Sequence, residues 1–304
     1  MNRALFITGS SGFIGKHLMP RLPLNQYENI YCLNRNQTEL TKEFSQHENF
    51  HFIQGNLLEP AAYERQLATS DTVIHLAAVT GKAKRNEYFA VNTDGTAKLV
   101  EKCKELGVKQ FLHTSTIAVK YANVKYYYYA QSKQLAEEIV RDSGLTYTII
   151  RPTIVLAEDA SIWQSLRDMA SKSVIMIPGK GLVKIQPIYL DDLIDCILYI
   201  LTEQLFENKA LDLGGPDVLT FESFLRQIHR GASQKEPRVV HLPLGLMRGC
   251  LGFLEKYVCS CPPVTAGQLS AFGNDGLADD NGVTDHHRDQ MKGIEDIIRL
   301  LIDE

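Results

Sequence analysis

The chain has 304 residues, 44% of them hydrophobic and 22% charged, so it is long enough to bury a substantial core. A formal net charge of −4, without a dense run of lysine and arginine, argues against nucleic acid as a partner. The first apolar run is too short for a signal peptide and no stretch approaches about 18 uninterrupted apolar residues, so we expect a cytoplasmic protein with no spanning membrane segment.

The first half of the chain alternates short apolar runs with amphipathic stretches. The apolar runs cover residues 4–9, 29–35, 50–57, 72–78 and 110–119, and helical patterns cover 13–22, 62–68 and 96–107. A helix from about Gln131 to Asp142, a strand over 146–152 and a strand end leading into a helix over 184–203 continue the series. This alternation is typical of βαβ units. It predicts an α/β fold with a doubly wound parallel (Rossmann) sheet.

The alternation weakens from about Leu156. Residues 156–180 and 216–282 hold most of the prolines and irregular polar stretches. We therefore predict a dinucleotide-binding domain over residues 1–155, to which about 183–213 return. A smaller, partly interleaved substrate domain is predicted mainly over 156–304.

A glycine-rich turn, TGSSGFIG, follows the first predicted strand and opens the first helix. Gly9, Gly12 and Gly15 would serve a tight turn, a close backbone approach to a pyrophosphate, and close packing of the helix on the strand. The amino terminus of the helix would attract the anion. The turn predicts dinucleotide binding.

Four consecutive tyrosines, 126–129, precede Lys133. A phenol with a pKa of about 10 relays protons poorly at neutral pH unless a nearby cation favours its ionised form. Residues four apart share a helix face, and only Tyr129 of the four has this spacing to Lys133. Tyr121 and Lys125 have the same spacing, but the residues around them do not continue a helical face. We predict that Tyr129 does the chemistry and that the other three tyrosines line the pocket or pack around it.

Several motifs, in the same order, resemble the short-chain dehydrogenase/reductase superfamily in its extended, epimerase/dehydratase-like branch. Besides the glycine turn they are residues 75–78 (H-x-A-A), 91–96 (V-N-x-x-G-T), 129–133 (Y-x-x-S-K), 151–153 (R-P-T) and 187–193 (P-I-H-V-D-D-V in the family). The resemblance spans residues 4 to about 228.

The resemblance implies roles for individual residues. Tyr129 would be the general acid/base, and Lys133 would bind the nicotinamide ribose and lower the pKa of the phenol. Thr116, with Ser115 as the neighbouring candidate, would bind the substrate oxygen, unless these hydroxyls only end the strand. No metal site is expected, and the family often forms homodimers. The implied cofactor-binding residues are Thr8, Gly9, Ser11, Gly12, Phe13, Ile14, Gly15, Asn34, Arg35, Asn56, Leu57, Leu76, Ala77, Ala78, Lys133 and Pro152.

The end of the second strand bears on the choice of cofactor. Asn34 and Arg35 stand where an acidic residue would bind the ribose 2′-hydroxyl of NAD. A guanidinium pairs with a 2′-phosphate, so NADP(H) is favoured. NAD(H) stays an alternative, because Asn34 can accept a ribose hydroxyl. Asn56 replaces the Asp that contacts adenine in the family's G-D-L motif, and its amide can make a similar hydrogen bond.

The chain departs from the family between Thr116 and Tyr129, where only twelve residues replace the longer loop of sugar-nucleotide epimerases. This resembles the atypical branch that includes the nicotinamide-nucleotide-binding accessory subunit of respiratory complex I. Two functions therefore stay open. One is an NAD(P)-dependent oxidoreductase or epimerase acting on a small carbonyl or hydroxyl compound such as a nucleotide sugar. The other is a non-catalytic NADPH-binding accessory or sensor protein that docks a partner.

Six cysteines, at 32, 103, 196, 250, 259 and 261, lack the spacing of a zinc site and are expected to be reduced. The apolar segment 242–258 suits a pocket or core, and a partner or membrane surface is the alternative. Burial of Leu246, Leu251 and Phe253 would count against that alternative.

Overall fold

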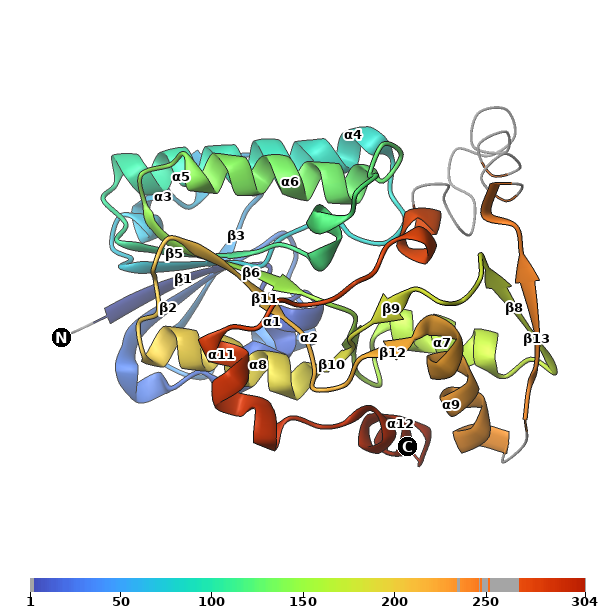
Figure 1. Ribbon diagram of the computed structural model, residues 1–304. Helices are drawn as coiled ribbons and strands as arrows, with labels where there is room; N and C mark the ends of the chain where they lie inside the picture. The colour runs from blue at the N-terminus through green and yellow to red at the C-terminus, as the bar shows by residue number, and fades with distance from the viewer. Residues whose placement is uncertain (1–2, 234–235, 246, 248–250, 252–267, 304) are drawn as a thin grey trace. The chain divides into compact units, whose positions relative to one another are not determined.

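The computed structural model of the protein describes residues 3–233, 236–245, 247, 251 and 268–303 (Figure 1). The chain divides into two compact units. Unit 1 consists of residues 1–115, 129–151 and 197–211, and unit 2 of residues 116–128, 152–196 and 212–304.

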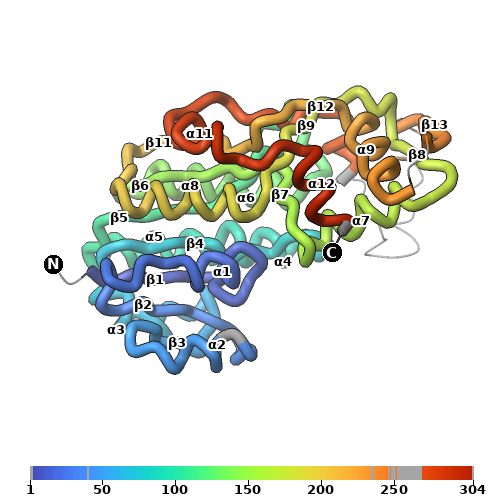
Figure 2. The backbone as a smooth tube through the Cα atoms, turned by 90° about the horizontal axis from the view of Figure 1, so that it is seen from below, coloured from blue at the N-terminus to red at the C-terminus, as the bar shows by residue number. Residues whose placement is uncertain are grey.

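A seven-stranded sheet forms the centre of unit 1, in the order β11-β6-β5-β4-β1-β2-β3 (Figure 2). Each neighbouring pair from β3 to β6 is parallel. The chain order reverses next to β1, which creates the switch point where such sheets bind ligands. The predicted doubly wound α/β fold is confirmed. The strands are β1 (Arg3–Thr8), β2 (Tyr27–Asn34), β3 (Phe50–Gln54), β4 (Thr72–His75), β5 (Gln110–Thr114), β6 (Thr146–Pro152) and β11 (Lys209–Leu213).

Helices cover both faces of this sheet. Helices α5 (Gly95–Glu105) and α6 (Tyr128–Arg141) lie side by side over one face, and α1 (Phe13–Leu18) lies on the other (Figure 1). Because β1 is buried on both faces, Leu5, Phe6 and Ile7 are all 0% exposed. This explains why the strand appears in the sequence as an uninterrupted apolar run. The connections also include α2 (Glu39–Phe44), α3 (Glu64–Leu67) and α8 (Leu190–Thr202).

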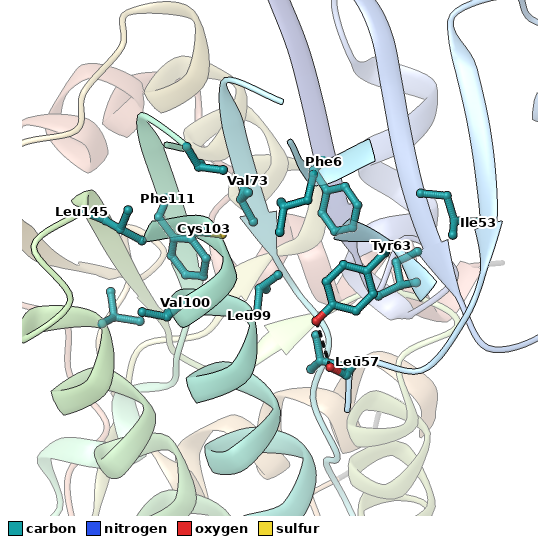
Figure 3. Close-up of a cluster of buried hydrophobic side chains, with 14 of the residues drawn as sticks. Phe6, Ile53, Leu57, Tyr63, Val73, Leu99, Val100, Cys103, Phe111 and Leu145 are labelled. Atoms are coloured by element: carbon teal, nitrogen blue, oxygen red, sulfur yellow. Dashed lines mark hydrogen bonds between the residues drawn. The ribbon is translucent and has the colours of Figure 1, made fainter. Parts of the chain in front are cut away.

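The core of unit 1 fills the space between the sheet and α5. Phe6, Val73 and Phe111 from three neighbouring strands contact Leu99 and Cys103 on α5 in one buried cluster (Figure 3). Tyr63 also lies in the cluster, and its hydroxyl donates a 3.0 Å hydrogen bond to the Leu57 carbonyl. This bond joins the loop after β3 to the core and so holds the loop at the edge of the sheet.

Two helices differ from their predicted ranges, and two short helical segments were not predicted. A short helix α4 (Arg85–Tyr88) and a π-helical segment (Phe89–Asp94) precede α5, and the sequence pattern did not predict either. Helix α6 begins at Tyr128, three residues before the predicted start, so Tyr129 lies inside it. Helix α1 is shorter than predicted because Pro20 falls in a 3₁₀ turn that follows Leu18.

The described part of unit 2 contains three two-stranded sheets, β10–β7, β12–β9 and β13–β8. Helix α9 contacts both α7 and α12. The elements are β7 (Val155–Leu156), β8 (Val174–Pro178), β9 (Lys184–Ile185), β10 (Ile188–Tyr189), β12 (Leu219–Thr220), β13 (Arg238–Leu242), α7 (Ser161–Ala170), α9 (Phe221–Ser233), α11 (Gly282–His287) and α12 (Ile294–Asp303).

Some sequence expectations can be followed only in part. Cys32, Cys103 and Cys196 are buried free thiols. Three other cysteines (250, 259 and 261) lie outside the described residues, as do Leu246 and Phe253, whereas Leu251 is half-buried. No helix among the described residues is long and apolar enough to cross a membrane.

Candidate active site

The glycine-rich turn is tightly packed. Gly9 has a φ of +76°, and a Cβ there would lie 2.6 Å from the Ala77 nitrogen. A Cβ on Gly15 would lie 2.3 Å from the Gly9 carbonyl oxygen, and the Gly12 N–H donates to the same oxygen at 2.9 Å. Two of these positions therefore admit only glycine. Helix α1 begins at Phe13, directly after Ser11 and Gly12, which are exposed.

A buried chain of hydrogen bonds connects three of the sequence motifs. The Thr96 hydroxyl donates to the Asn92 carbonyl (2.7 Å) and so accepts from His75 Nε2 (2.9 Å). His75 Nδ1 then accepts from the Thr8 hydroxyl (2.7 Å), which in turn accepts from the Ala77 N–H (3.3 Å). Burial lowers the pKa of His75 to about 3, helped by the charge of Lys133, so the ring is neutral. The direction of every bond in the chain is thereby determined.

The same network continues to α6 through the π-helical segment. Asn92 accepts from the Val79 N–H at 2.7 Å and donates both to the Val79 carbonyl and to the Ser132 hydroxyl at 3.0 Å. Ser132 donates to the Tyr129 carbonyl at 2.8 Å. Segments of π-helix occur frequently at functional sites. Here the segment places one amide side chain between the loop after β4 and the helix that carries Tyr129 and Lys133.

Lys133 is buried, with 1% of its surface exposed. Its ammonium group has no hydrogen-bond partner among the described residues. Burial lowers the pKa of Lys133 to about 7, against the opposing influence of the Glu137 carboxylate. His113 is also fully buried, and its ring lies 5.3 Å from that of His75. Burial holds the pKa of His113 well below its usual value, helped by Lys133 and His75, so His113 is neutral like His75.

An ion pair fixes the next turn of α6. Arg151 donates from Nε and from one terminal nitrogen to the two oxygens of Glu137, at 2.8 and 2.6 Å. Arg141 donates to the same carboxylate at 2.8 Å. Burial alone would raise the pKa of Glu137, but the hydrogen bonds from Arg151 outweigh it and hold this pKa below its usual value. The arginine of the R-P-T motif thus anchors the helix that carries Lys133.

Tyr129 and Lys133 lie four residues apart on α6, and residues at this spacing share a helix face. The half-buried Tyr129 ring packs near Tyr88, with 6.1 Å between the ring centroids. Tyr121 and Lys125 lie in an irregular stretch and not on a helix.

The other tyrosines of the run differ in their surroundings. Tyr126 is 56% exposed, with the Lys125 ammonium 5.5 Å from its ring centroid. Tyr127 stacks on Tyr121 with 6.5 Å between the centroids, and Tyr128 is half-buried at the first position of α6.

The predicted hydroxyl groups fall in different units. Ser115 is buried in unit 1, and its hydroxyl meets no partner at full hydrogen-bond geometry among the described residues, although it helps to lower the pKa of Glu137. Thr116 is half-buried in unit 2, where its hydroxyl accepts from the Ala118 N–H at 3.3 Å and caps a 3₁₀ turn. Pro152, also in unit 2, is buried. The roles given to these residues stay predictions.

The second strand ends at a buried amide and an exposed cation. Asn34 accepts from the Ser10 hydroxyl at 2.7 Å, while its Nδ2 has no partner among the described residues. Arg35 follows in an exposed position. The Asn56 side chain accepts from the Leu58 N–H at 3.1 Å, which leaves its amide nitrogen to donate. The Asn34 oxygen is therefore already engaged by Ser10, and its amide nitrogen is available to donate to a ligand, whereas the sequence position suggested an acceptor.

The remaining predicted cofactor residues surround the turn. The Leu76 N–H donates to the Thr8 carbonyl at 3.0 Å, which places the loop of Leu76, Ala77 and Ala78 against the end of β1. Phe13 and Ile14 are half-buried on α1. The Leu57 side chain packs directly against Gly95, where an added Cβ would lie only 2.7 Å from it.

These observations fit a bound dinucleotide. The glycine turn leaves room for a backbone approach that a Cβ would block, and Asn34 holds an orphaned buried donor next to it. Thr8 and Gly9 to Gly15 would hold the pyrophosphate, and Lys133 would hold a ribose. No group of three potential metal-ligating side chains occurs in the described part of the chain.

Sequence reasoning did not assign roles to several residues of this site. His75, Asn92 and Thr96 lie in the recognised motifs, but their hydrogen bonds include pairs 21, 40 and 67 residues apart. The i, i+4 series Lys133, Glu137 and Arg141 was visible in the sequence as alternating charges on one helix face and could have indicated the ion pair.

Comparisons with known proteins agree with this geometry. Residues 5–214 match the model of the NAD dependent epimerase/dehydratase family. The chain is 25% identical over 279 residues to N-acetyl-alpha-D-glucosaminyl-diphospho-ditrans,octacis-undecaprenol 4-epimerase of Escherichia coli O157:H7, covering 84% of this chain and 81% of that protein. It is 23% identical over 288 residues to divinyl chlorophyllide a 8-vinyl-reductase of Arabidopsis thaliana, covering 90% and 67% of the two chains.

Solved structures share the fold. The structure of UDP-glucuronic acid 4-epimerase from Bacillus cereus, in complex with UDP-glucuronic acid and NAD, aligns with a TM-score of 0.71 and 20% identity over 99% of this chain and 98% of the other. With a family model that matches well over half of its length, a doubly wound sheet and a glycine turn that fits a dinucleotide, this chain belongs to the NAD-dependent epimerase/dehydratase family.

Proposed function

We propose that this enzyme transfers hydride between a nicotinamide cofactor and a hydroxyl- or carbonyl-bearing carbon of a nucleotide sugar or a related substrate, with Tyr129 as the general acid/base. The observation that carries the proposal is the α6 arrangement. Tyr129 and a buried Lys133 share one helix face, and Asn92 and Ser132 tie that helix to the loop beside the glycine turn. A scaffold that only binds nucleotide has no need for this pair.

Each residue has a defined task in this proposal. When bound, the nicotinamide accepts or donates the hydride. Tyr129 takes the proton from the substrate hydroxyl, or returns it to the carbonyl oxygen. Lys133, when protonated, favours the ionised phenol. The buried network around His75 keeps the turn and the helix in register, so that the phenol is held in one position.

We propose NADP(H) as the preferred cofactor and NAD(H) as the alternative. Arg35 supports this preference, because it is exposed at the end of β2 and has no ion pair in the described part of the chain. Asn34 has an Nδ2 donor without a partner among the described residues, and it lacks the negative charge that would repel a 2′-phosphate.

Two measurements test the proposal. Mass spectrometry of the nucleotide released on denaturing freshly purified protein identifies the cofactor and its redox state. Tightly retained NAD would favour an epimerase or dehydratase that recycles its cofactor, and would contradict the role given to Arg35. NADPH, or an empty site that NADPH fills better than NADH, would favour a reductase.

Turnover is then assayed with nucleotide sugars and simple carbonyl compounds. Tyr129→Phe is expected to retain cofactor affinity and to lose turnover. Tyr126→Phe is the matched control, because Tyr126 is exposed and should be dispensable. Equal activity of Tyr129→Phe and wild type would remove Tyr129 from the mechanism.

The alternative function is a non-catalytic NADPH-binding accessory or sensor protein of the atypical branch. The short stretch of twelve residues between Thr116 and Tyr129 favours it, since the longer loop helps bind substrate in the epimerases that the sequence resembles. Bound NADPH without turnover of any tested substrate, together with capture of a specific partner by the wild-type protein, would support this alternative.

A further inference from the structure

Unit 2 contains a cavity of about 680 Å³. This volume lies within the range of small-molecule sites, about 300–1,000 Å³. Most of the side chains that line it are apolar: Leu182, Val183, Leu242, Pro243, Leu244 and Phe272. None of them takes part in the site described above. This lining suits a ligand with a substantial apolar part.

The wall of the cavity is built on a rigid turn. Gly179 and Gly181 have φ values of +76° and +68°, and a Cβ on either would lie 3.0 Å from a neighbouring side-chain atom. The Gly179 N–H donates to the Leu242 carbonyl at 2.8 Å, and the Gly181 carbonyl accepts from the Glu222 N–H at 3.0 Å. These bonds fix the turn on both sides. Leu182, directly after it, is 65% exposed at the cavity although it is a large aliphatic side chain.

Strands β8 and β13 pair next to this wall (Figure 1). Exposed apolar side chains lie along this two-stranded ribbon. Met176 pairs with Val240 in register, and they are 58% and 46% exposed. The next pair on the same face is Pro178 and Leu242, and Leu242 lines the cavity. Residues paired across parallel strands point to the same face, so cavity and ribbon form one continuous apolar track. Such a track suits an elongated apolar chain better than a compact ring.

The charges around the cavity leave one cation available. Glu222 binds both His241 (2.8 Å) and Arg226 (2.7 Å), so its charge is balanced. The Asp275 carboxylate accepts from the Lys184 N–H at 2.8 Å. Lys180, presented by the glycine turn, is exposed and has no ion pair within the described residues. An anionic group at the end of the apolar chain would complement it.

We propose that unit 2 binds a single amphiphile, with its apolar chain in the cavity and along the β8–β13 ribbon and its anionic group at Lys180. The site goes beyond the proposed hydride transfer. Its occupation requires neither nicotinamide nor turnover, so the proposal stands or falls independently of Tyr129.

The test is calorimetric titration of the full-length protein with decyl phosphate below its critical micelle concentration, compared with decanol and inorganic phosphate. Decyl phosphate is expected to bind, decanol more weakly, and phosphate not detectably. Leu182→Gln should weaken decyl phosphate binding about five- to tenfold, since the variant loses the apolar contact that the bound decyl chain would make with the exposed leucine. Lys180→Gln should weaken it about threefold and leave decanol unchanged.

Matched controls come from the same unit. Val218→Gln removes a comparably exposed aliphatic side chain (53% exposed) away from the cavity, and Lys172→Gln removes an exposed lysine; both should bind like wild type. Because Leu182 is exposed, its variant should fold normally, which circular dichroism checks. Phe272→Ala, which also loses a contact to Phe221 (5.0 Å between centroids), is a second and stronger probe.

Three results would overturn the proposal. The first is no binding of decyl phosphate up to its solubility limit. The second is equal binding by wild type and Leu182→Gln. The third is binding to phosphatidylglycerol vesicles that is stronger than binding to monomeric decyl phosphate and equal for wild type and Leu182→Gln. This result would indicate adsorption to a membrane surface.

Discussion

Replacing Lys133 with methionine should make the nucleotide-free protein more stable while it damages the cofactor site. The Lys133 side chain is 1% exposed, and burial lowers its pKa from 10.5 to about 7. Methionine has a similar length and no charge, so it should occupy the same space without the desolvation penalty. Glu137 would keep its hydrogen bonds from Arg151 and Arg141, so no other buried charge would be left without a partner.

The magnitude follows from the lowered pKa. A fall from 10.5 to about 7 corresponds to about 5 kcal/mol of lost stability at neutral pH, at about 1.4 kcal/mol per pKa unit. Between pH 7 and 10.5 the unfolded wild-type chain binds more protons at this position than the folded chain, so wild-type stability rises with pH across this window. The advantage of Lys133→Met should therefore be largest at pH 7 and below, and shrink toward pH 10.5.

Urea unfolding of the nucleotide-free proteins at about pH 7 and about pH 9.5 measures both quantities. A gain of at least about 2 kcal/mol at the lower pH, and a much smaller gain at the higher, is the expected result. Lys104→Met, which changes an exposed lysine of α5, is the control and should shift stability by less than about 0.5 kcal/mol. A Lys133→Met protein that is less stable than wild type at pH 7, or equally stabilised at both pH values, would refute the reasoning. Nucleotide affinity of the same variant should fall.

Three further changes test other parts of the site. Gly15→Ala should abolish nucleotide binding in a fluorescence titration and cost at least about 2 kcal/mol of stability, because its Cβ would lie 2.3 Å from a backbone oxygen; normal binding would contradict the packing described here. Arg151→Met should destabilise the protein by about 3–5 kcal/mol in urea, and a second change, Glu137→Met, should recover much of the loss. A double variant as unstable as the single one would argue against the ion pair as the cause. Arg35→Gln should weaken NADPH about tenfold and leave NADH unchanged, whereas an equal loss for both would exclude a 2′-phosphate contact.

The parts of the fold that the sequence predicted correctly depend on local patterns. The buried strands of the central sheet appear as apolar runs because both of their faces are covered, as at Leu5 to Ile7. The glycine spacing and the Tyr129–Lys133 spacing also fall within one turn or one helix. The two-residue strands of unit 2 are too short to show any period, and the π-helical segment before α5 has no known sequence pattern that would have indicated it.

The contacts that hold the candidate site together do not depend on local patterns, because they join residues from different elements. His75 bonds to Thr8 across 67 positions and Arg151 bonds to Glu137 across 14, and one sequence contains no signal that pairs such positions. The motifs indicated which residues matter, but not what they touch. The division into domains and the roles of Thr116 and Ser115 in substrate binding stay predictions.

The hydrogen-bonded chain from Thr8 to Ser132 has a consequence for how the protein folds. Its bonds join residues 67, 21 and 40 positions apart, so they close only after the strands between them have paired. Contacts of such sequence separation form slowly. An amino-terminal fragment that ends before β4 would contain every glycine of the phosphate-binding turn, yet lack the segment that supports Gly9. In the proposed function Lys133 on α6 holds the ribose, so during synthesis the cofactor would be captured only after α6 has emerged, by chains that already contain β1 to β5.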